Sequence, residues 1–268
     1  RSPEAWIEKA IETSQRSLQV NPNFYETYRN LASIYAIQAQ YEAGYGRSPQ
    51  APLTKALEHL ALASKANPND AETHRGLSQV YCLSARDLIE HKRDPEDPLS
   101  KGLQAIQRSI FISPNSPESY LLQVQLLLLS AQNDAQNGKS PLATLQQAQG
   151  AAARARDLNA KIPGVYLHLG EIARVTAEWQ VAHQKAAEED IAHGLSAVEQ
   201  ALGLNPTLAP ALAVRGALYL LQARATRGEK RKQAAGLAAA ALQQALGKNP
   251  LLEHQYGALL GEATQLSR

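Results

Sequence analysis

The sequence contains no methionine and only one cysteine, and it is poor in aromatic side chains. With Cys82 alone, neither a disulfide framework nor a cysteine-based zinc site can form within the chain. Aromatic residues make up 5% of the total, whereas alanine, leucine and glutamine are abundant. These residues are good helix formers with few β-branched competitors, so the composition predicts an all-α fold. Because residue 1 is not methionine either, we expect the chain to be a piece of a longer protein.

The chain also lacks a strong charge of either sign. It has 27 basic and 25 acidic residues and a net charge of +2. Proteins that bind nucleic acid or an anionic membrane usually carry a clear excess of positive charge, which this chain lacks. No apolar run approaches the roughly 18 residues of a membrane span, and no signal-peptide pattern opens the sequence. These absences predict a cytoplasmic protein with no membrane segment and no nucleic-acid partner.

What the chain does have is a helix break that recurs at a fixed spacing. An Asn-Pro or related step falls at steps of 46, 46, 46, 46 and 44 residues, namely at Pro22, Pro68, Pro114, Ala160, Pro206 and Pro250. Positions six, ten and thirteen after a break are mostly large, small and large, as in Tyr28, Ala32 and Tyr35. Offsets of three, four and seven lie on one helical face, so each break is predicted to open a first helix, called helix A.

A second helix, helix B, is predicted upstream of each break. The residue twelve positions before every break is small: Ala10, Ala56, Gly102, Ala148, Gly194 and Ala238. Small residues at one register position let this helix approach its neighbours closely. A pair of helices repeated at a fixed period is typical of a solenoid in which each unit packs on the next.

The pattern Tyr28-x2-Leu31-Ala32-x2-Tyr35, followed by Ala56-x3-Leu60 and Pro68, resembles the tetratricopeptide repeat. The resemblance implies a right-handed helix-turn-helix superhelix that binds protein or peptide in a concave groove and is not an enzyme. The family period is 34 residues, whereas the period here is 46. The additional residues lie between the two stripes, and residues 24–43 are predicted to form one long helix. The usual groove geometry is therefore not assumed.

The expected organisation is a single repeat array over residues 1–268. Residues 3–20 form a lone helix B, and residues 250–268 form a lone or capping helix. The repeats between them cover about residues 22–67, 68–113, 114–159, 160–205 and 206–249.

A narrower resemblance concerns the first loop. Tyr41-Glu42-x3-Gly46-Arg47-Ser48-Pro49, followed by a Leu-x2-Ala helix, is similar to repeats C-terminal to the catalytic domain of some bacterial serine/threonine protein kinases. This implies a regulatory or substrate-recruiting region of a larger bacterial signalling protein, although the kinase motifs themselves are absent here. The alternative is a free-standing adaptor or assembly protein. An RNA-reading repeat is a third class, which the balanced charge disfavours.

No residues are predicted to be catalytic, to bind a cofactor or to bind a metal. Gly138-Lys139-Ser140 resembles the end of a phosphate-binding loop, but Asn133 stands where that motif requires glycine. The basic run from Arg224 to Lys232 is expected to be a solvated loop. Four residues lack the spacing of a metal site and are expected to be solvated: His183, Glu188, Glu189 and His193.

The candidate binding residues lie on the face of helix A that helix B does not cover. Positions seven, eleven and fourteen after a break form this wall, and its candidates are Arg29, Arg75, Gln79, Leu121, Gln125, Leu128, Glu171 and Arg174. Arg29 and Arg75 occupy equivalent turns and suit a carboxylate or phosphate. The alternative is that they pair locally with Glu26 and Glu72.

The third helix A is predicted to be apolar on nearly every side between Leu121 and Leu129. Such a helix is either buried within the stack or covered by a partner.

Overall fold

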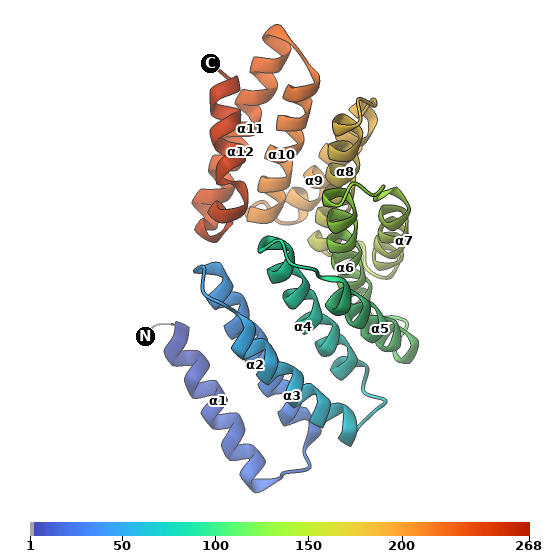
Figure 1. Cartoon of the computed structure of the whole chain (residues 1–268), viewed down its shortest axis with the longest axis vertical. Coiled ribbons are helices and arrows are strands. Elements are labelled where there is room, and N and C mark those ends of the chain that lie inside the picture. Colours follow the sequence, from blue (N-terminus) through green and yellow to red (C-terminus); the bar gives the residue numbers. More distant parts are fainter. Residues whose placement is uncertain (1–2) are drawn as a thin grey trace. The chain divides into compact units, whose positions relative to one another are not determined.

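The computed structural model describes residues 3–268 and shows only helices in that range (Figure 1). The helices are α1 (Pro3–Val20), α2 (Tyr25–Gly44), α3 (Gln50–Ala66), α4 (Ala71–Glu90), α5 (Glu96–Ile112), α6 (Pro117–Gln136), α7 (Leu142–Leu158), α8 (Pro163–Ala182), α9 (Glu188–Leu204), α10 (Ala209–Ala225), α11 (Gly228–Lys248), the 3-10 helix η1 (Pro250–Leu252) and α12 (Glu253–Leu266).

The helix starts follow the period of the sequence. The A helices α2, α4, α6, α8 and α10 begin at residues 25, 71, 117, 163 and 209, each 46 residues after the last. The predicted all-α fold of repeated helix pairs is confirmed. Helix α2 has 20 residues, a length of about 30 Å, so the long first helix is also observed.

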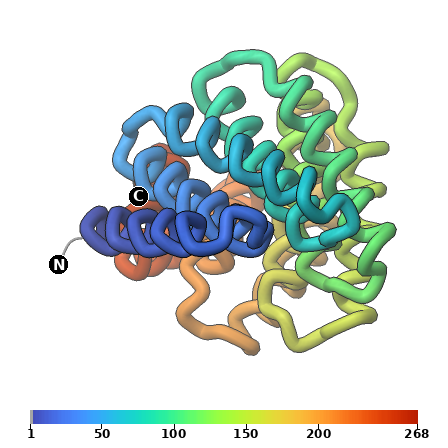
Figure 2. Tube along the Cα trace, turned by 90° about the horizontal axis from the view of Figure 1, so that it is seen from below, coloured from blue at the N-terminus to red at the C-terminus, as the bar shows by residue number. Residues whose placement is uncertain are grey.

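Two compact units divide the chain, and the boundary falls within α6, between Leu129 and Ser130. In unit 1, α1 packs on α2, α2 on α3 and α4, and α4 on α3 and α5 (Figures 1 and 2). In unit 2, α8 packs on α7, α9 and α10, and α10 packs on α9, α11 and α12. A single continuous array with right-handed superhelical twist stays a prediction.

The small residues of the B helices lie where neighbouring helices meet. Ala56, Ala148 and Ala238 are fully buried. A Cβ atom added to Gly102 would lie 2.8 Å from Leu126 Cδ2, and one added to Gly194 would lie 2.9 Å from Leu218 Cδ2. These distances are shorter than a normal carbon contact, so only a small residue fits at this register position.

The turn after each long A helix has the same geometry four times. Gly46, Lys92, Gly138 and Gln184 have φ of 70°, 54°, 73° and 56° and are spaced 46 residues apart. The next residue donates its backbone N–H to the carbonyl five positions earlier, as from Lys139 to Asp134 at 2.8 Å. This is the Schellman closure of a helix end, for which glycine is the preferred residue. Gly138 is therefore a helix-ending glycine in the turn between α6 and α7.

The last helix pair departs from the expected boundaries. The structure places Arg224 in the last turn of α10, and α11 begins at Gly228, so the basic run is mostly helical. The expectation of a solvated loop from Arg224 to Lys232 is wrong in this respect. The first three A–B turns carry a proline just before helix B, at Pro49, Pro95 and Pro141, and this turn has none. The turn before α9 also lacks a proline and keeps the 46-residue spacing, so the missing proline does not by itself explain the early start of α11.

The apolar helix α6 is largely buried. Leu122, Leu126 and Leu129 join Cys82 and Ile106 in one hydrophobic cluster of unit 1, and Leu121 is half-buried. Among the described residues, no helix combines the length and apolar character that a membrane crossing requires.

Candidate binding surfaces

The wall predicted on the A helices begins with Arg29 on α2. Its Nη1 atom donates to Asp70 Oδ2 at 3.0 Å, and 26% of the Arg29 side chain is exposed. Asp70 is the N-cap of α4 and also accepts from the Thr73 backbone N–H at 3.1 Å. The partner of Arg29 therefore comes from the next repeat, and the expected local pair with Glu26 is not the ion pair that forms.

Arg75 occupies the equivalent turn of α4 and pairs with Glu72, three residues earlier, as the local alternative predicts. The Arg75 side chain is half-buried, and so is Gln79 one turn further along. Both arginines thus stand on neighbouring A helices of unit 1 with one carboxylate each. Carboxylate pairing holds a guanidinium in place through directional hydrogen bonds.

The three layers of the predicted wall differ in how deeply their side chains are buried. The layer fourteen residues after the breaks is buried at Ala36, Cys82, Leu128 and Leu220. Leu128 is 6% exposed, so it offers a ligand little area. Leu121 and Gln125, in the layers at seven and eleven, are half-buried and remain within reach of solvent.

In unit 2 the predicted wall residues on α8 are engaged within their own helix. His168 Nδ1 lies 2.7 Å from Glu171 Oε2, and Arg174 Nη1 donates to Glu178 Oε1 at 2.6 Å. Burial disfavours the charged guanidinium of Arg174, but Glu178, the Tyr256 hydroxyl and Glu171 outweigh this effect. Together they raise the pKa of Arg174 above its ordinary value, so the side chain stays charged.

Arg224 adds an ion pair that the sequence did not indicate. Its Nε and Nη2 atoms donate to the two carboxylate oxygens of Glu262 on α12 at 2.8 and 2.6 Å. The hydrogen bonds lower the pKa of Glu262 and raise that of Arg224. This bidentate pair connects α10 to the last helix and shows that α12 is packed on the array.

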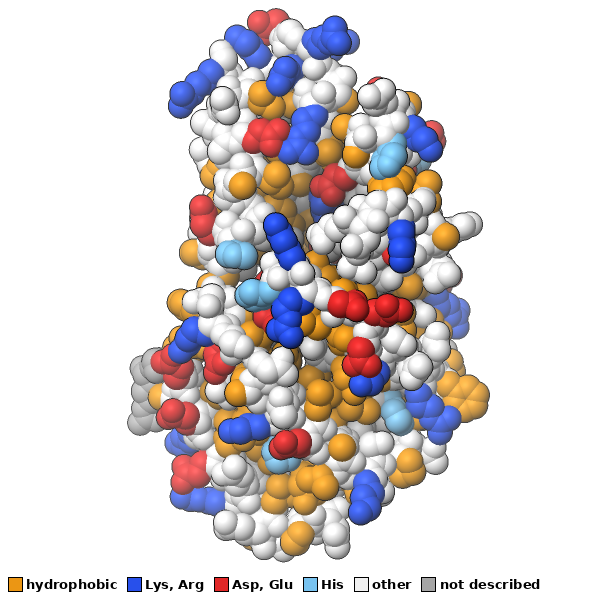
Figure 3. Space-filling view, viewed as in Figure 1, with side chains coloured by type: hydrophobic (Ala, Val, Ile, Leu, Met, Phe, Trp, Pro, Cys, Tyr) orange, Lys and Arg blue, Asp and Glu red, His pale blue; other side chains and the backbone are white. Residues whose placement is uncertain are grey.

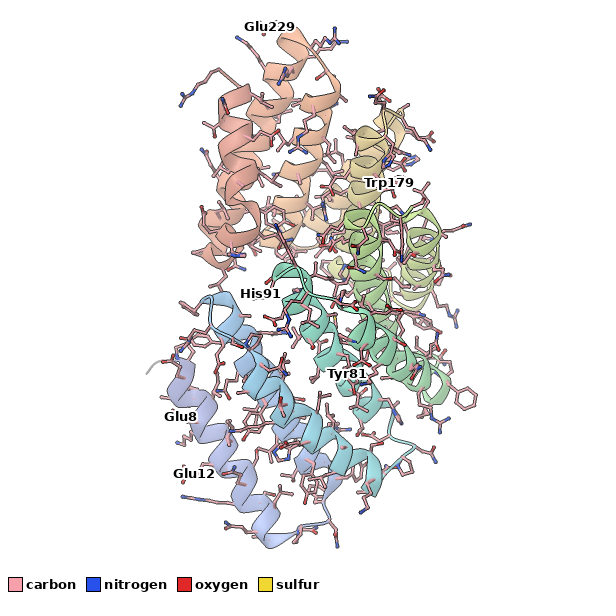
Figure 4. All side chains as sticks on the ribbon, viewed as in Figure 1. Glu8, Glu12, Tyr81, His91, Trp179 and Glu229 are labelled. Carbon is pink, nitrogen blue, oxygen red and sulfur yellow. The ribbon has the colours of Figure 1, made fainter. Side chains whose placement is uncertain are left out.

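Two clefts lie between successive B helices. The α3–α5 cleft has a volume of about 680 Å³ and includes Leu57, Tyr81 (labelled in Figure 4) and Lys101 in its lining. The α7–α9 cleft has a volume of about 380 Å³ and includes Gln149, Ala173 and His193.

The two clefts occupy the same place in the repeat. Several lining residues correspond two periods apart, since Leu57, Tyr81 and Lys101 lie 92 residues before Gln149, Ala173 and His193. An A helix forms the floor in both, and the B helices on either side form the walls. Sequence reasoning missed these surfaces because their lining residues carry no shared motif.

The two histidines considered as metal ligands in the sequence, His183 and His193, lie in different surroundings. His183 follows the last residue of α8, with its ring 3.7 Å from that of Trp179 (labelled in Figure 4). His193 instead lines the α7–α9 cleft. Within residues 3–268, no group of three or more histidine, cysteine, aspartate or glutamate side chains is arranged to hold a metal ion.

No protein-family model and no curated protein matches the sequence. The fold is similar to that of TTC0263, a thermophilic TPR protein of Thermus thermophilus, with a TM-score of 0.58 and 17% identity over 88% of this chain and 100% of that one.

A second similar structure is a human IFIT1 dimer with m7Gppp-AAAA, with a TM-score of 0.51 and 14% identity. The match covers 98% of this chain and 63% of that one. At these identities the likeness concerns the fold alone. The helix pairs, their small-residue contacts and the likeness to TTC0263 together give this chain a tetratricopeptide-like helical-repeat fold.

Proposed function

We propose that the protein is a non-enzymatic scaffold that binds another protein or a peptide on its A-helix wall. The observation that carries the proposal is the pair Arg29 and Arg75, which stand half-buried on equivalent turns of the neighbouring helices α2 and α4. Each guanidinium is held by one carboxylate and has further N–H groups that can donate to a ligand. Held side chains lose little conformational freedom on binding, which favours affinity.

The partner that suits this wall is a peptide with an acidic group and an apolar anchor. The arginines provide charge-assisted hydrogen bonds, Gln79 and Gln125 provide amide groups, and Leu121 provides accessible apolar area. Glu171 and Arg174 belong to the proposed wall of unit 2, where their existing ion pairs hold them in position. Leu128 supports the wall from beneath rather than touching the ligand, because it is buried.

The test begins with affinity purification of partners on the full chain, followed by calorimetry with the recovered partner. Replacing both arginines by alanine should weaken binding by about 1–3 kcal/mol if they bond a ligand carboxylate. The matched control is Arg47→Ala with Arg16→Ala, two exposed arginines outside the wall. Unchanged affinity of the wall variant, with a folded protein, would refute the wall.

The more specific setting is the regulatory or substrate-recruiting region of a bacterial serine/threonine kinase. It rests on the resemblance of the first loop, Tyr41 to Pro49, and on no feature of the fold. Sequencing the gene upstream of Arg1 tests it, since a kinase domain would carry its catalytic motifs there. If no such domain precedes the chain, the free-standing adaptor becomes the preferred setting.

RNA binding calls for a direct test because one similar fold, human IFIT1, was solved with a capped oligonucleotide. Basic and acidic side chains are interspersed on the face shown in Figure 3, and the net charge is only +2. Proteins that bind nucleic acid usually concentrate positive charge on one face. We therefore expect no binding to random RNA at low salt, measured by fluorescence anisotropy.

A further inference from the structure

The α7–α9 cleft has an apolar floor that is not covered by any described helix of its own unit. Leu169, Ile172 and Ala173 of α8 form part of the floor, and Leu145 of α7 and Ala197 of α9 form part of the walls. Leu142, at the start of α7, adds an apolar side chain that is 39% exposed. The cleft has a volume of about 380 Å³, within the range of roughly 300–1,000 Å³ for pockets that bind small ligands. A few apolar side chains of a partner occupy a similar volume, so they can fit in it.

The next repeat closes the equivalent place with a polar bridge. Arg215 of α10 donates to Glu199 of α9 at 3.1 Å and to Gln244 of α11 at 3.4 Å, and so links two successive B helices. Leu169 occupies the position 46 residues before Arg215 and cannot make such a bridge. The fold can therefore close this cleft. At α7–α9 it stays open, and its lining combines apolar side chains with polar ones such as Gln146, Gln149 and Thr176.

The two ends of the cleft carry opposite charges. Each B helix is antiparallel to the A helix beside it, so α7 and α9 begin at the same end. At that end stands Asp190, in the first turn of α9, next to two more acidic residues, Glu188 and Glu189. At the other end stands Arg156, in the last turn of α7, which lines the cleft and lies 3.9 Å from the exposed carboxylate of Asp157 outside the lining.

We propose that the α7–α9 cleft binds an amphipathic helix of a partner protein that runs antiparallel to α7 and α9. Helices are commonly acidic in the first turn and basic in the last, because this arrangement complements the helix dipole. A helix in this direction places its acidic first turn at Arg156 and its basic last turn at Asp190. Its apolar residues, three and four apart, contact the accessible side chains of Leu169 and Leu142, above the buried Ile172.

This surface is separate from the A-helix wall, so the proposal goes beyond the proposed function. The lining of the cleft comes from α7, α8 and α9. The arginines of the wall stand on α2 and α4. A partner could therefore engage the cleft whether or not the wall binds a peptide.

The test uses two synthetic helical peptides with the same leucine face and opposite charge order. The first carries glutamates in its first turn and lysines in its last turn, and the second has these exchanged. Fluorescence anisotropy with the full chain should show about tenfold tighter binding of the first peptide, since both ends contribute exposed ion pairs. Equal affinities would overturn the proposed direction, and no binding of either would overturn the site.

Two variants locate the binding. Arg156→Glu changes an exposed side chain and should remove most of the preference between the peptides. The double variant Ala153→Glu with Leu169→Arg rebuilds the bridge of the next repeat, because Gln200 already stands where that repeat has Gln244. The double variant should lose peptide binding and keep its thermal midpoint.

The control is Ala153→Gln alone, which leaves Leu169 in the floor, adds no charge beside Arg156 and should bind the first peptide as the parent does. If the double variant does not fold, Arg156→Glu decides the question. A preference between the peptides that survives Arg156→Glu, or peptide binding that survives in a folded double variant, would place the peptide elsewhere and overturn the proposal. If the cleft does not bind the peptides, the experiment on Arg29 and Arg75 is unaffected. The two proposals can therefore be refuted separately.

Discussion

Arg29 on α2 reaches into the next repeat and bonds Asp70, the residue that caps α4, with Nη1 and Oδ2 3.0 Å apart. One carboxylate thus serves a helix end and an ion pair between repeats at the same time. Its 13% exposure limits competition from water and salt. Asp70 therefore both caps the start of α4 and holds Arg29 in position. The start of α4 and the placement of this arginine on the predicted wall depend on the same carboxylate.

Asp70→Ala removes both the cap and the ion pair, and we expect it to lower the free energy of unfolding by about 1–3 kcal/mol. Asp70→Asn is the matched control, since asparagine also caps a helix but carries no charge. It should cost less, because it loses only the charged pair with Arg29, and the further loss in Asp70→Ala measures the cap. Urea unfolding of the three proteins provides the values, and an unchanged free energy of unfolding in Asp70→Asn would show that the charged pair adds nothing.

Gln184→Gly should stabilise the protein by about 0.5–1 kcal/mol, because glycine accepts the left-handed backbone at lower cost than glutamine. Gln184 has a φ of 56° at the position that Gly46 and Gly138 occupy in other turns. Thermal unfolding measures the change. Gln184→Ala removes the side chain and keeps the backbone strain, so it should not stabilise, and equal behaviour of the two variants would contradict the explanation.

Glu262 should make stability depend on pH in the acid range. Its hydrogen bonds with Arg224 lower its pKa in the folded protein, so the stabilisation is present above the unfolded pKa and is lost as the pH falls through the folded one. The Glu262 side chain is 36% exposed, and solvent screening keeps the effect below about 1 kcal/mol.

Glu262→Gln should therefore lower the thermal midpoint at neutral pH and have a smaller effect at a pH below both pKa values. The control is Glu12→Gln, because Glu12 pairs with Arg16 on a helix surface where both side chains are mostly exposed. A midpoint difference that stays constant across the acid range would contradict the expected linkage.

Leu128→Ala should cost about 2–5 kcal/mol of unfolding free energy, as for other buried leucines, because Leu128 is 6% exposed. Leu121→Ala, two wall layers away, should cost less, since that side chain is half-buried and keeps contact with water. Chemical denaturation separates them. Similar, small losses for both variants would mean that Leu128 is not part of the core and could meet a ligand.

Sequence reasoning anticipated the side-chain contacts on the A helices only in part. The register identified residues that share a face of helix A, and it anticipated the Arg75–Glu72 pair because that pair lies within one helix turn. It missed the partners of Arg29 and Arg224, which lie 41 and 38 residues away in the chain. Pairs at such separations depend on how neighbouring helices meet, which no local pattern records.

The sequence by itself determined the repeated helix pairs, their long A helices and the small residues at their contacts. These features are local, since they depend on turn residues such as Gly46 and Gly138 and on side-chain spacing along one helix. Only the tertiary structure decided that Leu128 is buried, that Arg29 belongs to Asp70, and that a cleft remains above Leu169. The reason is that exposure and pairing are set by the approach of helices a full period apart, which follows from packing and not from the spacing of residues within a repeat.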